Sequence, residues 1–85
     1  MNEEQIDRFM VWFRGFCEYT RISITECAAQ GCDWVDGFNS GYVCGLLAGV
    51  SRMIKSVDLP FETLVDCETA RDGLQSLFDT YPGRN

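Results

Sequence analysis

Hydrophobic residues recur at intervals of three and four positions along most of this chain, which is the spacing of one face of an α-helix. Over residues 3–20 the positions on that face are Ile6, Phe9, Met10, Phe13, Phe16, Cys17 and Thr20. The helix dipole favours negative charge in the first turn, and three acids stand there: Glu3, Glu4 and Asp7. The pattern predicts a first long helix over residues 3–20.

The next segment has the signals of a second, short helix. Ser23 and Glu26 have the spacing of a capping box, in which the serine caps the helix start and the glutamate bonds back to it. Gly31 stands where a C-terminal cap is expected. These signals predict a separate short helix over residues 24–30.

A third helix is predicted from Asp33 to about Val57, because the apolar residues fall on one broad arc throughout this segment. They are Val35, Tyr42, Val43, Leu46, Leu47, Val50, Met53, Ile54 and Val57. The alternative is a β-hairpin with strands at 34–36 and 42–44, since the intervening sequence DGFNSG has turn chemistry. We favour the helix because the spacing continues unbroken across the glycines.

The last helix is predicted to begin at Asp58 and Pro60, two residues that favour helix starts. Its apolar positions are Phe61, Leu64, Val65, Leu74, Leu77, Phe78 and Tyr81. Its middle is weaker, because polar residues crowd the apolar side and Gly73 favours a bend. The prediction is an all-α, single-domain helical bundle over residues 1–85, with three longer helices and one short helix. An α+β fold with a short hairpin near 34–44 is the alternative.

Glycines occupy every fourth position from Gly37 to Gly49. A glycine inside a helix costs about 1 kcal/mol relative to alanine, so close packing of the backbone is expected to offset this cost. A phosphate-binding loop is excluded, because no Lys or Arg lies between Arg21 and Arg52. We therefore predict a helix-packing or dimer face made of Gly37, Gly41, Cys44, Gly45, Ala48 and Gly49.

The residues that catalysis and metal binding most often need are absent or badly spaced. The chain has no His, and its five cysteines include no Cys-x-x-Cys pair. No nucleophile elbow and no calcium loop occurs. We expect a non-enzymatic protein without a cofactor or a bound metal, whose thiols are free in a reducing compartment. A Cys27–Cys32 bridge or a reactive Cys32 is the alternative.

The charge balance bears on partners and location. Thirteen acids against seven bases give a net charge of −6, which argues against direct binding to nucleic-acid phosphates. The N-terminus is acidic where an export signal is basic, and the longest apolar run is far shorter than the ~20 residues of a membrane span. We expect a cytoplasmic protein that binds neither nucleic acid nor membrane.

Two groups of side chains predict a protein partner. Six acids are concentrated in residues 58–85 and predict an acidic face suited to a basic surface. They are Asp58, Glu62, Asp66, Glu68, Asp72 and Asp79. Trp12 and Tyr19, seven residues apart and outside the apolar arc of their helix, are the candidate aromatic anchors.

The function that these features favour is binding. A small acidic chain without catalytic motifs suits an inhibitor or adaptor that occupies a basic, nucleic-acid-handling surface of its partner. In size and charge the chain resembles the short inhibitors of phages and mobile elements, including anti-CRISPR proteins, and this resemblance is one of composition that rests on no motif. The alternative is a structural or regulatory helical homodimer that packs through the glycine and small-residue face.

Overall fold

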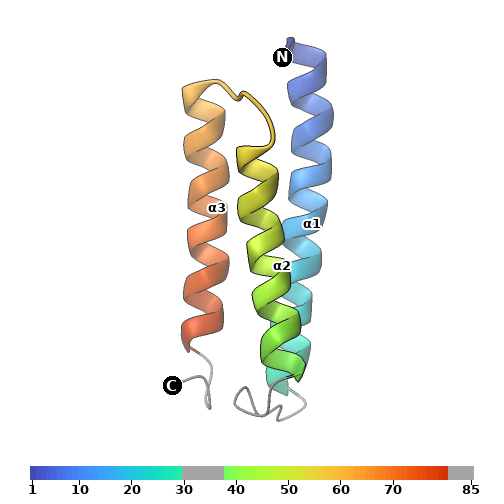
Figure 1. Ribbon diagram of the computed structural model, residues 1–85, viewed down its shortest axis with the longest axis vertical. Helices are drawn as coiled ribbons and strands as arrows, with labels where there is room; N and C mark the ends of the chain where they lie inside the picture. Colours follow the sequence, from blue (N-terminus) through green and yellow to red (C-terminus); the bar gives the residue numbers. More distant parts are fainter. Residues whose placement is uncertain (30–37, 81–85) are drawn as a thin grey trace.

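Three α-helices make up nearly all of the computed structural model, which describes residues 1–29 and 38–80. They are α1 (Glu3–Ala29), α2 (Phe38–Lys55) and α3 (Phe61–Thr80). The helices alternate in direction, so that α1 and α3 run parallel and α2 runs against both, and each helix contacts the other two (Figure 1). No strand occurs among the described residues, and the all-α prediction is confirmed.

The N-terminus of α1 is fixed by a reciprocal cap. The Asn2 side-chain oxygen accepts a hydrogen bond from the Gln5 backbone N–H at 2.8 Å, and the Gln5 side-chain oxygen accepts one from the Asn2 N–H at 2.9 Å. This exchange satisfies two backbone donors that the first turn of a helix leaves unpaired. It explains why the helix begins at Glu3.

The prediction of a separate short helix is wrong, because α1 continues without a break to Ala29. Buried positions keep their helical spacing across the proposed boundary: Thr20 and Ile24 are both fully buried. The Thr20 hydroxyl donates to the Phe16 carbonyl oxygen at 2.8 Å, which places this polar group in the core at little cost. Burial of Ile24 therefore outweighs the local capping signal. Gly31 lies outside the described residues.

The hairpin alternative is wrong where it can be compared with the structure, because residues 42–44 lie inside α2. Residues 34–36 lie outside the described part of the chain. The helix ends at Lys55, close to its predicted end, and Ser56 closes it. The Ser56 hydroxyl donates to the Met53 carbonyl oxygen at 2.7 Å, and its backbone N–H donates to the same oxygen at 3.2 Å.

The core lies along the axis where the three helices meet, and each helix contributes to it. Its buried apolar residues are Phe13, Ile24, Val43, Leu47, Val50, Ile54, Cys67, Leu74 and Phe78. Phe9 stacks on Phe13 with ring centroids 5.8 Å apart. The Cys67 thiol lies 3.6 Å from the Met10 sulfur and joins α3 to α1. The result is an elongated bundle of 43 × 17 × 16 Å, whose long sides carry the candidate sites.

Candidate protein-docking surfaces

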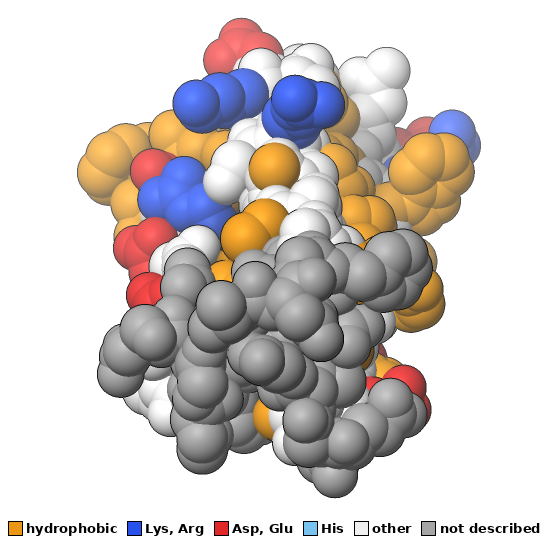
Figure 2. Space-filling model, turned by 60° about the horizontal axis from the view of Figure 1, so that its bottom comes forward, with side chains coloured by type: hydrophobic (Ala, Val, Ile, Leu, Met, Phe, Trp, Pro, Cys, Tyr) orange, Lys and Arg blue, Asp and Glu red, His pale blue; other side chains and the backbone are white. Residues whose placement is uncertain are grey.

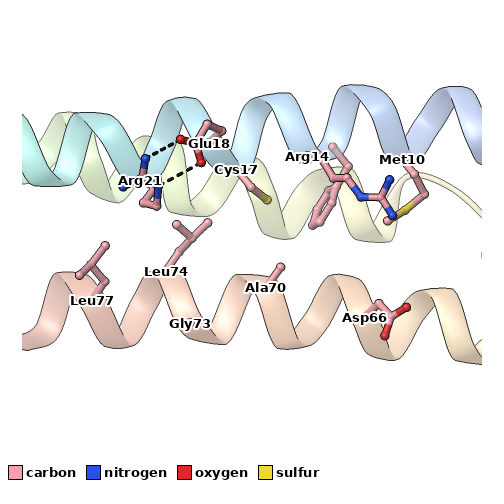
Figure 3. A pocket seen from close by; sticks show the side chains of 11 residues that line it. Met10, Arg14, Cys17, Glu18, Arg21, Asp66, Ala70, Gly73, Leu74 and Leu77 are labelled. Carbon is pink, nitrogen blue, oxygen red and sulfur yellow. Dashed lines mark hydrogen bonds and ion pairs between the residues drawn. The ribbon is translucent and has the colours of Figure 1, made fainter.

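A groove runs between the parallel helices α1 and α3 and has a volume of about 560 Å³ (Figure 3). Its apolar lining comes from both helices and consists of Met10, Phe13, Cys17, Ala70, Leu74 and Leu77. The groove is open partly because α3 places Ala70 and Gly73 along it, and a Cβ atom at Gly73 would meet nothing within 4 Å. Sequence reasoning missed this groove, although the two small residues three positions apart were a signal for it.

Charged side chains border the groove. Arg14, Glu18 and Arg21 lie along its α1 side, and Asp66 lies on its α3 side (Figure 3). The Arg21 Nε donates to a Glu18 carboxylate oxygen at 3.0 Å, and this hydrogen bond lowers the pKa of Glu18.

The thiol inside the groove is poorly suited to nucleophilic chemistry. Burial, with a smaller contribution from the neighbouring Cys67, raises the pKa of Cys17 to about 11. Burial also raises the pKa of Cys67. A protonated thiol is a weak nucleophile. The groove therefore offers an apolar contact surface with a charged border.

The six candidate acids of the last helix do not form one face. Asp58, Glu62 and Asp66 are exposed and follow one another at intervals of four residues, and we call these three residues the acidic stripe. Asp66 borders the groove towards α1, whereas Asp72 lines a second groove, towards α2. A helix turns about 100° per residue, so these two carboxylates lie about 120° apart around α3.

The acids on the other flank of α3 have partners within the helix. A guanidinium nitrogen of Arg71 lies 3.7 Å from a Glu68 carboxylate oxygen and 3.1 Å from an Asp72 carboxylate oxygen. The Arg71 side chain is only 28% exposed. The Gln75 amide donates to Asp79 at 3.0 Å. In the described part of the chain no Lys or Arg comes within ion-pair distance of the acidic stripe. Glu62 and Asp66 of α3, together with Asp58 just before it, are therefore carboxylates without an ion-pair partner among the described residues.

The two candidate aromatic anchors are exposed, and both lie on the side of α1 away from α3. Trp12 is 77% exposed and Tyr19 is 52% exposed. The hydroxyl groups of Tyr19 and Tyr42 share a hydrogen bond, which ties this side of α1 to α2 and raises the pKa of Tyr42. Val11 and Ile22 are further exposed apolar residues of α1. The structure therefore separates the aromatic anchors from the acidic stripe.

The predicted small-residue face is largely open. Gly41, Cys44, Gly45 and Ala48 are exposed, and a Cβ atom at Gly41 or Gly45 would meet nothing within 4 Å. Among the described glycines of this face, Gly49 alone is in close contact, since its Cβ would lie 3.1 Å from the Phe16 ring. In Figure 2, backbone and uncharged polar side chains, drawn white, follow the middle of the view, with Lys and Arg side chains beyond them. Gly37 lies outside the described residues.

The described residues contain no group of three or more His, Cys, Asp or Glu side chains arranged to hold a metal ion. Within the same residues, none of the helices combines the length and the apolar character needed to cross a membrane. Comparisons with family models, with curated proteins and with solved structures find no match for this chain.

Proposed function

We propose that this chain is a non-enzymatic protein-binding module that occupies a basic surface of a partner protein as an inhibitor or adaptor. The observation that carries the proposal is the acidic stripe, whose three exposed carboxylates have no ion-pair partner among the described residues. Such a surface is available to the cationic side chains of an incoming partner.

The geometry of the stripe suits a groove that binds nucleic acid. Glu62 and Asp66 are four residues apart on α3 and are therefore separated by about 6 Å along its axis. Asp58 precedes the helix and extends this group of negative charges beyond its N-terminus. A protein that binds nucleic acid supplies Lys and Arg side chains to neutralise phosphates. A carboxylate row competes for those side chains and speeds encounter through electrostatic attraction.

The neighbouring groove adds an apolar contact to this charge. Asp66 belongs to the stripe and also borders the groove between α1 and α3. A partner that pairs with the stripe can therefore bury an apolar side chain against Ala70 and Leu77. Burying apolar surface contributes about 25 cal/mol per Å², whereas exposed charge pairs contribute little to affinity. The stripe therefore speeds association with the partner, and apolar contact in the groove stabilises the complex.

The proposal is tested by parallel affinity capture from a host lysate with wild-type protein and two charge-reversed variants. Glu62→Lys with Asp66→Lys reverses the stripe. Glu68→Lys with Asp72→Lys makes the same change in net charge on the other flank of α3 and is the matched control. We expect the first variant to lose a partner that wild type and control both retain, with helicity equal in all three.

Two results would contradict the proposal. One is retention of every captured protein by the stripe variant, which would make the stripe a solubilising surface. The other is equal loss in both variants, because the effect would then follow net charge and not the position of the carboxylates.

A further inference from the structure

The outward side of α1 carries a second repeat of three and four residues besides the one that faces the core. Its members follow at intervals of four, three, four, three and four, and we call this set the outer seam: Arg8, Trp12, Gly15, Tyr19, Ile22 and Glu26. All six are exposed, and at the edge of the seam the Tyr19 hydroxyl shares a hydrogen bond with the Tyr42 hydroxyl of α2. This spacing is the one by which helices pack in a coiled coil.

The outer seam is complementary to itself when it is read in reverse. A two-fold axis midway between Gly15 and Tyr19 places each of these residues opposite the other in a second copy. The same axis places Trp12 opposite Ile22. At the ends of the seam it places Arg8 opposite Glu26.

Size and charge match in these pairs. A Cβ atom at Gly15 would meet nothing within 4 Å, so the backbone there is open to a large side chain such as the half-exposed ring of Tyr19. Among the described residues Arg8 pairs only with Glu4 of its own helix, and both side chains are more than two-thirds exposed. Such an exposed pair is weak, so the guanidinium is available to Glu26 of a second copy.

We propose that the chain forms an antiparallel homodimer through the outer seam of α1. A symmetric dimer uses the same patch on both copies. In the antiparallel arrangement Tyr19 lies opposite Gly15 and Arg8 lies opposite Glu26, so that size and charge both match. The seam from Arg8 to Glu26 is about 27 Å long. It lies on the flank of α1 away from the α1–α3 groove, so both acidic stripes stay accessible. The dimer is independent of the proposed function.

The first test is sedimentation of the full chain over a concentration series, with wild type and Gly15→Gln. The wild-type mass is expected to rise from 9.6 kDa towards twice that value. In the variant the glutamine fills the space that Tyr19 of the second copy occupies, so the dissociation constant rises at least about tenfold. The monomer keeps its fold, since glutamine is a better helix former than glycine.

The second test is a charge exchange. Arg8→Glu alone and Glu26→Arg alone each place like charges opposite one another twice in the dimer, so each raises the dissociation constant about tenfold. The double variant restores opposite charges and returns the constant to within about twofold of wild type. Arg14→Glu changes an exposed arginine of α1 outside the seam and is expected to leave dimerisation unchanged.

A monomer at every concentration would overturn the proposal. So would a dimer that survives Gly15→Gln and dissociates on Gly45→Gln, because that result assigns the interface to the small-residue face of α2. Failure of the double charge exchange to restore a dimer that the single variants weaken would overturn the antiparallel arrangement.

Discussion

At the scale of single residues, the glycines of α2 differ in what surrounds them. Gly45 faces open space, so its replacement by alanine adds a methyl group without a clash. Alanine is favoured over glycine in a helix by about 1 kcal/mol, and we expect Gly45→Ala to raise the free energy of unfolding by about that amount. Gly49→Ala is expected to gain less, because its Cβ would lie 3.1 Å from the Phe16 ring. Urea unfolding of both variants measures the difference, and equal gains would contradict the close contact.

The thiol of Cys17 makes stability depend on pH in the alkaline range. Burial raises its pKa from 9.0 to about 11 in the folded chain. Above pH 9 the unfolded chain releases this proton while the folded chain keeps it, so stability is full below pH 9 and falls as the pH approaches 11.

We therefore expect the urea midpoint of the wild type to fall between pH 9 and pH 11, and to fall less steeply in Cys17→Ala. Cys44→Ala removes an exposed thiol and is the control that keeps the wild-type slope. Identical slopes in all three proteins would show that Cys17 ionises alike in the folded and unfolded states.

At the scale of helices, the continuity of α1 rests on Ile24. This residue is fully buried, whereas Ile22, two positions before it, is 40% exposed. Removing one buried methyl group costs about 1 kcal/mol. We expect Ile24→Val to destabilise the monomer by about that amount and Ile22→Val to have almost no effect, as measured by urea unfolding at low concentration. Equal effects of the two substitutions would contradict the burial of Ile24 in the core.

The helices themselves could be predicted from the sequence, because the spacing of residues such as Phe13, Val50 and Leu74 reports which side is buried. The break near residue 23 was mispredicted because a capping box is a local signal, and the burial of Ile24 depends on the other helices. The separation of the acids into two groups could also be predicted from the sequence, because Asp66 and Asp72 lie about 120° apart around any helix.

The orientation of those surfaces could not be predicted from the sequence. Which groove Asp66 borders depends on whether α1 or α2 lies on that flank of α3, and this is decided by how the three helices are arranged around the core. The same arrangement decides that Gly49 meets Phe16 while Gly45 remains open. Periodicity fixes the buried side of a helix but not the identity of its neighbours.

At the scale of the whole molecule, the net charge of −6 is unevenly distributed. Arg71 pairs with two acids on one flank of α3, whereas the acidic stripe has no ion-pair partner in the described residues. The exposed Trp12 and Tyr19 lie on a third side, along α1. A bundle with three different sides can bind a basic partner and a second copy of itself at the same time, because the two contacts do not overlap.

The central claim is that the acidic stripe is the surface offered to a basic partner, and the association rate constant with the captured partner tests it most directly. At low salt, wild type is expected to associate at least about ten times faster than Glu62→Lys with Asp66→Lys, because attraction between opposite charges speeds encounter. The difference is expected to shrink as salt shortens the range of that attraction, from about 10 Å at 0.1 M to about 3 Å at 1 M. Equal association rate constants at every salt concentration would contradict the claim.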